Sequence, residues 1–199
     1  ITSGAAFSVT LNSADKAAIN LILNKDGTTS TGGTTYNLEA AEDWASGADA
    51  SVTVADLTGN GITVSNVAVP TLTSASYDAN TGVLAVTGTG LLKLSGGAND
   101  IDVTKLTLKG QGAGTRTLTT TSVEITSGTG FSVTLNSADK TAVNLILDKN
   151  GTSSSDSTTY NLAGAEDWAS GADASVTVAD LTGNGITVSN VAANPVSIT

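Results

Sequence analysis

The sequence predicts a mainly β protein, built from immunoglobulin-like (Ig-like) β-sandwich repeats with short helical insertions and arranged in tandem. Three observations support this fold class. Thr and Ser account for 55 of the 199 residues and Gly for another 22, and these residue types favour short strands and tight turns. Apolar and polar residues alternate in many short stretches, as they do in half-buried strands. Finally, a long part of the chain occurs twice.

The repeat sets the expected domain organisation. Residues 1–68 align with residues 125–192 without a gap, at a constant offset of 124, and differ at 12 of the 68 positions. Such similarity indicates a recent tandem duplication. We therefore expect residues 1–68 to be the C-terminal part of one repeat. Residues 69–192 then form one full 124-residue repeat, and residues 193–199 begin the next.

This division leaves residues 1–68 without the strands that residues 69–124 supply to the full repeat. Their apolar faces must then be covered by residues 69–124 or by strands from a neighbouring chain. A second division stays open, in which 1–68 and 69–124 are separate modules that alternate along the chain. The 124-residue unit is preferred, because a piece of about 60 residues buries only about 60% of its unfolded surface.

Period-2 alternation predicts most of the strands. They are expected around Phe7–Leu11, Val52–Val54, Ile62–Val64, Leu84–Val86, Leu106–Leu108 and Val123–Ile125. A hairpin is expected from Thr71–Tyr77 and Val83–Thr87, because Asp78–Gly82 between them has turn-forming Asn and Gly.

Two short helices are expected in each copy of the repeated segment. The first begins at Asn12 or Ser13 and ends by Gly27, and it recurs between Asn136 and Gly151. The second covers the eight residues that end in Trp44 and Trp168. The ranges of this second helix are Asn37–Trp44 and Asn161–Trp168. We expect its Asn to cap it and its Trp to plug the rim of the sandwich.

Composition excludes several classes of function. The chain has no Cys, His or Met, so the usual zinc, haem and iron–sulfur ligands and the Ser–His and Cys–His nucleophile pairs are missing. With 8 Lys and Arg against 18 Asp and Glu, the net charge is -10, which disfavours nucleic acid as a partner. No apolar run is long enough for a membrane span. We predict that the protein is not an enzyme and has no catalytic residues.

Three stretches of the chain carry a resemblance to a known class of proteins. They are Val69–Leu84, Asn99–Leu108 and Phe131–Asp139, and they resemble repeats of giant bacterial surface proteins, namely repetitive adhesins and surface-layer or matrix proteins of Gram-negative bacteria. The resemblance implies an extracellular location at the bacterial cell surface, type I secretion and an array of Ig-like modules that calcium often stiffens. The sequence lacks the Gly-Gly-x-Gly-x-Asp nonapeptide of calcium β-rolls. The stretch most similar to that pattern is Gly96–Asp102, and it does not match it.

Calcium is the one cofactor that this composition suits, because it binds carboxylate, amide and carbonyl oxygens. One candidate site is the loop that contains Asp148, Asn150 and Asp156, which also reads as the end of a helix. A second site combines residues of the hairpin turn with a later acidic turn, since turns at one end of a sandwich lie together. The residues of this second site are Asp78, Asn80, Asn99, Asp100 and Asp102.

Other polar features allow further interpretations. Glu42-Asp43 with Asp49, and the copy Glu166-Asp167 with Asp173, are adjacent carboxylates of the kind used by glycosidases, but a solvated turn or a calcium ligand at an interface is favoured. Thr115–Thr121 suits an ice-binding or carbohydrate-binding face, or simply the polar face of a sheet.

The sequence as a whole predicts a structural module that assembles with neighbouring copies of itself, head to tail or by strand complementation, into a fibre, sheath or surface layer. The alternative is an adhesin module that binds a glycan or another cell-surface partner. Against it stands the scarcity of Trp, Tyr and Arg, which often anchor recognition surfaces.

Overall fold

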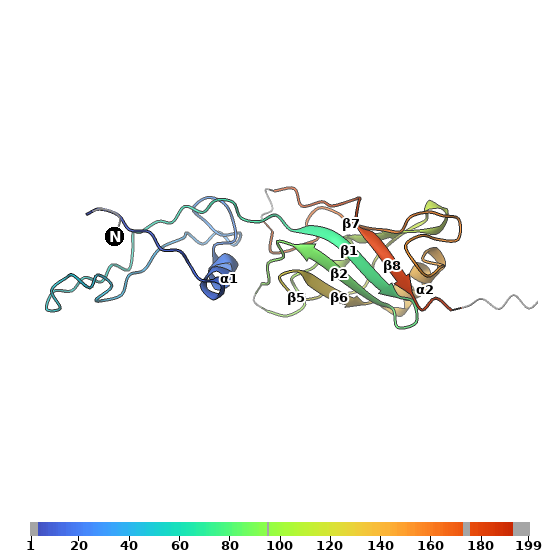
Figure 1. The fold of residues 1–199 in the computed structure, drawn as a ribbon, viewed down its shortest axis with the longest axis horizontal. Helices are drawn as coiled ribbons and strands as arrows, with labels where there is room; N and C mark the ends of the chain where they lie inside the picture. Colours follow the sequence, from blue (N-terminus) through green and yellow to red (C-terminus); the bar gives the residue numbers. More distant parts are fainter. Residues whose placement is uncertain (1–3, 95, 173–175, 193–199) are drawn as a thin grey trace, which may run out of the picture. The chain divides into compact units, whose positions relative to one another are not determined.

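The computed structural model describes residues 4–94, 96–172 and 176–192. The chain divides into two compact units, unit 1 (Ile1–Val67) and unit 2 (Ala68–Thr199), which are blue to cyan and green to red in Figure 1. No helix in the described ranges has the length and apolar character of a membrane span.

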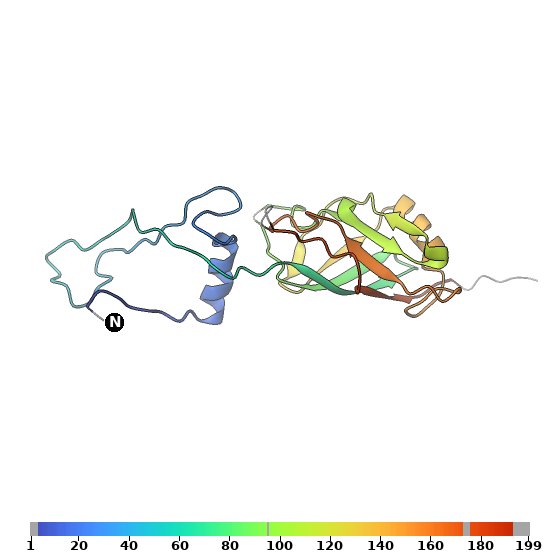
Figure 2. The ribbon, with the colours of Figure 1, turned by 90° about the horizontal axis from the view of Figure 1, so that it is seen from above.

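Unit 2 contains all eight strands of the described chain, and they form one curled sheet (Figures 1 and 2). The strands are β1 (Thr71–Asp78), β2 (Val83–Thr89), β3 (Leu106–Lys109), β4 (Thr115–Thr117), β5 (Ile125–Ser127), β6 (Gly130–Thr134), β7 (Asn161–Gly164) and β8 (Gly185–Ser189). Two 3-10 helices, η1 (Val103–Lys105) and η2 (Gln111–Ala113), flank β3. The predicted mainly β class is confirmed.

The two halves of unit 2 are interleaved in this sheet. Its strand order is β4-β3-β7-β8-β1-β2-β6-β5, so a pair from residues 69–124 is always followed by a pair from residues 125–192. We call these two halves segment 69–124 and segment 125–192. Neither segment makes a continuous sheet alone, because the ladders β3–β7, β1–β8 and β2–β6 each join one segment to the other.

The hairpin predicted near the start of the repeat is confirmed. Strands β1 and β2 pair antiparallel, and the Asp78 carboxylate accepts hydrogen bonds from the backbone N–H groups of Asn80 and Thr81 at 2.9 Å. Gly82 has φ 79°, a conformation that glycine adopts without steric cost. Local turn chemistry therefore sets this part of the fold.

The first predicted helix is confirmed in both copies, as α1 (Ser13–Ile22) and α2 (Ser137–Ile146). In each copy an Asn side chain caps the helix by accepting from the N–H of the Asp three residues later. Both helices end five residues before the predicted glycine.

The second predicted helix is wrong. Asn161–Gly164 forms β7, which pairs with β3 and buries Leu162, and a turn follows before Trp168. The Asn161 side chain, interpreted as a helix cap, accepts instead from the backbone N–H of Asn184. In unit 1 the copy Asn37–Trp44 is also not helical. Pairing with distant residues overrides the local preference here.

The core of unit 2 is formed mainly by side chains of the strands and loops of the curled sheet, and Val143 of α2 joins it. Its largest fully buried side chains are Trp168, Tyr77, Tyr160, Leu84, Ile101, Leu106 and Leu108. Trp168 was expected to plug the rim of a sandwich. It is fully buried, and its indole N–H donates to the Val178 carbonyl at 2.8 Å.

Unit 1 has the same local conformation as segment 125–192 but no strand ladder within its described residues. Besides α1, it has four isolated bridges that join pairs of described residues, which are Gly27↔Val64, Thr29↔Thr35, Asn37↔Gly61 and Ala40↔Asp56. Each of them has an equivalent pair in unit 2 at the offset of 124. Unit 1 is thus the same half-structure without its interleaving partner.

Candidate functional site

The first calcium candidate is a loop held together by hydrogen bonds. Asp148 accepts from the Ser155 N–H and hydroxyl and from the Tyr160 hydroxyl. Burial opposes ionisation of Asp148, but the bonds from Ser155 and Tyr160 outweigh it and lower the pKa. The Asn150 side-chain oxygen accepts from the Val191 N–H at 2.9 Å.

Asp156, the third member of that loop, reaches across to segment 69–124. Its carboxylate accepts from the Ser154 hydroxyl, from the Thr158 N–H at 2.9 Å and from the Gly112 N–H at 2.8 Å. These bonds lower the pKa of Asp156. The residue joins the two segments of unit 2.

The second calcium candidate is split between separate places. Asp78 caps the hairpin turn and accepts from the Asn190 side chain at 2.8 Å. The Asn80 carbonyl accepts from the Lys140 ammonium at 2.6 Å, so a cation already faces this turn. The Asp102 side chain caps η1 by accepting from the Thr104 N–H and hydroxyl.

The remaining members, Asn99 and Asp100, join the acidic turn to β5. Asp100 is fully buried and accepts from the Leu94 N–H at 2.6 Å and from the Ile125 N–H at 2.7 Å. The Asn99 N–H donates to the Glu124 carboxylate at 2.9 Å. Both contacts hold the chain at the junction between segments 69–124 and 125–192.

Over the described ranges, no three His, Cys, Asp or Glu side chains gather into a group that could hold a metal ion. The candidate carboxylates accept hydrogen bonds from N–H and hydroxyl donors instead, in separate parts of unit 2. Calcium binding therefore stays a prediction.

The acidic pairs take part in loop structure. Glu166 accepts from the backbone N–H groups of Val178 and Ala179, and Glu42 makes the same contacts with Val54 and Ala55 in unit 1. Two backbone hydrogen bonds hold the first glutamate of each pair against a loop.

The third acidic residue of that feature lies in a turn in unit 1. Asp49 accepts from the Ser51 N–H and hydroxyl, and these bonds lower its pKa. The copy of Asp49, Asp173, lies outside the described residues.

The Thr-rich stretch 115–121 does not form one long strand. Only Thr115–Thr117 belongs to β4, where the hydroxyl of Thr117 contacts that of Thr107 at 2.8 Å. Thr119 and Thr120 turn to α2 instead.

The most connected polar side chain of unit 2 is Asp139, in the first turn of α2. It is fully buried. The Arg116 guanidinium lies 2.7 Å from one carboxylate oxygen, and Thr119 and Thr120 donate through both their N–H and hydroxyl groups at 2.7–3.0 Å. Burial opposes ionisation, but the bonds from Thr120, Thr119 and Arg116 outweigh it and lower the pKa of Asp139 to about 2. Asp139 thus fixes α2 to segment 69–124.

Further polar contacts connect the two segments elsewhere in unit 2. The Tyr77 hydroxyl donates to the Asn144 side chain at 2.7 Å, and burial, aided by the Asp78 charge, raises the pKa of Tyr77 to about 12. The Asp180 carboxylate accepts from the Leu72 N–H at 2.9 Å. We call Asp139, Lys140, Asn144, Asp156, Asp180 and Asn190 the polar contact set of segment 125–192.

Unit 1 retains five of these six residues at the offset of 124, namely Asp15, Lys16, Asn20, Asp56 and Asn66; Gly32 replaces the sixth. Asp15 is exposed, and its hydrogen bonds among the described residues go to its helix cap, Asn12. Arg116 is the sole arginine of the chain, so no second arginine can serve Asp15.

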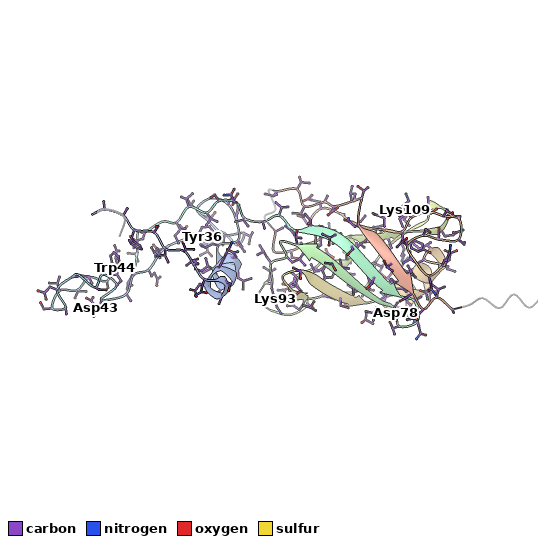
Figure 3. All side chains as sticks on the ribbon, in the orientation of Figure 1. Tyr36, Asp43, Trp44, Asp78, Lys93 and Lys109 are labelled. Atoms are coloured by element: carbon purple, nitrogen blue, oxygen red, sulfur yellow. The ribbon has the colours of Figure 1, made fainter. Side chains whose placement is uncertain are left out.

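Apolar residues of unit 1 show the same difference. Phe7 is 51% exposed whereas its copy Phe131 is 2% exposed, and Trp44 is 50% exposed whereas Trp168 is fully buried. The two ring pairs are otherwise alike, with centroids 5.9 Å apart in unit 1 and 6.2 Å apart in unit 2. Trp44 is labelled in Figure 3. The rings are therefore arranged for a cover that only unit 2 has.

We define the acceptor face of unit 1 as the exposed apolar residues whose copies are buried beneath segment 69–124. These residues are Phe7, Val9, Leu11, Leu38 and Trp44, and their copies are Phe131, Val133, Leu135, Leu162 and Trp168. Full burial of one such side chain contributes about 1.5–3 kcal/mol, so these half-exposed residues leave roughly 4–8 kcal/mol of stabilisation unrealised.

Three other apolar positions are exposed in both copies and serve as an internal comparison. They are Leu21 and Leu145, Val52 and Val176, and Leu57 and Leu181. These positions stay exposed in unit 2 with segment 69–124 present, so the acceptor face is a specific set of positions.

Sequence reasoning missed Asp139 and Arg116. Two signals point to them: Arg116 is the sole arginine, and Asp139 follows an Asn helix cap that recurs, together with the Asp, at the offset of 124. Comparison of the chain with protein-family models, with curated proteins and with solved structures finds no match.

Proposed function

We propose that this chain is a structural repeat module of an extracellular bacterial surface protein, which forms an extended fibre, sheath or surface layer. In this proposal each module is an Ig-like β-sandwich, and neighbouring modules follow one another head to tail. The mechanism is mechanical and geometric: strands pair within a module, and short joins set the spacing between modules.

One observation carries the proposal. Unit 2 takes in the whole 69–192 period and interleaves its two segments in one sheet, and the same half-structure recurs in unit 1 at the offset of 124. A module with this period can be copied along a chain without a change to its fold. The resemblance to bacterial surface repeats and the net charge of -10 suit an extracellular location.

A tandem series tests this proposal. Chains with one, two, three and four copies of residues 69–192 should show a radius of gyration that grows in proportion to copy number in small-angle scattering. The melting temperature should be the same whatever the number of copies. Collapse to a compact particle would contradict the extended array, and specific hits on a glycan array would favour the adhesin alternative.

Calcium is a separable part of the proposal. If calcium stiffens the array, EDTA should lower the melting temperature of the four-copy chain, and calcium, but not magnesium, should restore it. Identical melting curves with EDTA and with calcium would contradict the calcium part of the proposal and would leave the proposed array unaffected.

A further inference from the structure

We propose that the acceptor face of unit 1 is a docking surface for a further polypeptide segment of the 69–124 type, which covers it as segment 69–124 covers segment 125–192. The inference does not depend on where the protein works. It rests on a bound example within the same chain, since nearly the same 68 residues appear once covered and once uncovered.

The uncovered copy already has the conformation of the covered one. The Trp44 indole N–H donates to the Val54 carbonyl at 2.8 Å, as Trp168 does to Val178. The four bridges of unit 1 match those of unit 2. Docking therefore requires little rearrangement of unit 1, which lowers the cost of association.

Both apolar and polar parts of the surface remain in place. The acceptor face presents apolar side chains to the positions that segment 69–124 fills in unit 2. Asp15, Asn20 and Asp56 are identical to the residues that bind Arg116, Tyr77 and the Leu72 N–H there. The partner is thus a β-forming segment with an arginine and a tyrosine at the corresponding positions.

The chain's own segment 69–124 cannot cover unit 1 in this way. Gly185–Ser189 runs parallel to Ser74–Asp78, so Gly61–Ser65 would have to end beside Asp78 while the chain returns to Thr71. That return covers roughly 23 Å, whereas residues 66–70 span at most about 21 Å when fully extended. Parallel strands also need a crossover of about a dozen residues.

A whole second copy of the chain is also a poor occupant. Each copy of the chain has two segments that need a cover, unit 1 and segment 125–192, but it has only one segment 69–124 to supply that cover. An exchange between two copies would cover one acceptor only by uncovering another, so it gains no net burial. The occupant is therefore an additional segment of this type.

Two substitutions adjust which segment fits best. Gly164 lies where an added Cβ would be 3.1 Å from Leu72 Cδ1 and 2.8 Å from Trp168 Cδ1, and unit 1 has Ala40 at this position. A Cβ added at Gly130 would be 3.0 Å from the Val86 carbonyl oxygen. Unit 1 has Ala6 at the position of Gly130. Unit 1 should therefore prefer a segment with a smaller residue than Leu72, and Ala40→Gly should tighten binding of the 69–124 sequence.

The test adds a synthetic 69–124 peptide, which contains no tryptophan, to the intact chain that carries Trp168→Phe. Emission of Trp44 should shift to the blue and saturate at one peptide per chain. Asp15→Asn should weaken binding at least tenfold, whereas the matched Asp139→Asn should not weaken it. Ala40→Gly should strengthen binding severalfold.

A covalent version guards against poor solubility of the peptide. Residues 69–124 are fused ahead of Ile1, which recreates the Glu124–Ile125 junction, and hydrogen exchange should then show protection of residues 7–11. Trp44 that stays exposed in both experiments would overturn the proposal. A dimer of the unmodified chain with Trp44 buried would overturn the choice of occupant.

Discussion

The Arg116 guanidinium on β4 lies 2.7 Å from the carboxylate of Asp139 on α2, and this ion pair joins two segments that are interleaved in one sheet. Asp139 is fully buried, whereas Arg116 is about one third exposed. The pair is completed by the Thr119 and Thr120 donors, so the carboxylate has a partner for each oxygen.

Loss of the Asp139 charge should destabilise unit 2. In a Trp44→Phe background, Asp139→Asn should lower the free energy of unfolding by about 3 kcal/mol, because it leaves the donors of Arg116, Thr119 and Thr120 poorly matched. Urea unfolding followed by Trp168 fluorescence measures the change. The matched control, Asp15→Asn, should alter stability by less than about 0.5 kcal/mol, and equal losses in the two variants would contradict this role.

Unit 2 should lose stability at acidic pH. Asp139 has a folded pKa of about 2 against an ordinary value of 3.8, so the unfolded chain binds its proton first as the pH falls. The stabilisation is present above about pH 4 and is lost as the pH falls towards 2, and it amounts to about 2 kcal/mol. Urea midpoints measured between pH 6 and pH 2 test this, and Asp139→Asn should flatten the curve in that window.

An alanine methyl group should destabilise unit 2 at position 164 but not unit 1 at the equivalent position 40. Gly164→Ala places a Cβ against the Trp168 ring and Leu72, and such overpacking costs about 1–3 kcal/mol. Ala40→Gly, the reverse change in unit 1, should alter the stability of the intact chain by less than about 1 kcal/mol. Thermal melting of the two variants checks both values. A neutral Gly164→Ala would show that Leu72 can move away.

The two tryptophans should report different environments. Trp44 is half exposed and Trp168 is buried, so a Trp168→Phe chain should emit at longer wavelength and be quenched more strongly by acrylamide than a Trp44→Phe chain. Equal quenching of the two variants in dilute solution would indicate that another surface covers unit 1.

The sequence was enough to predict elements whose signals are local. Asn136 and its identical copy marked the helix starts, and Asp78–Gly82 marked the hairpin, because a cap and a turn act within a few residues. The helix expected at Asn161–Trp168 failed because its backbone bonds go to β3, which lies about 55 residues away in the chain.

The calcium candidates show a similar limit. Sequence spacing placed Asp100 and Asp102 together, but it could not show that Asp100 binds the Leu94 and Ile125 N–H groups while Asp102 caps η1. Donors supplied by distant backbone decide what a carboxylate does. The repeat, by contrast, is visible in the sequence at once, and it directed attention to the one segment that is absent from unit 1.

The parallel pairing of β1 with β8 has a mechanical consequence. The chain enters unit 2 at the start of β1 and leaves it at the end of β8, and these two points lie at opposite ends of the Ser74–Asp78 and Gly185–Ser189 ladder. Tension applied along the chain would therefore load this ladder in shear, and its hydrogen bonds would have to rupture together rather than unzip one after another.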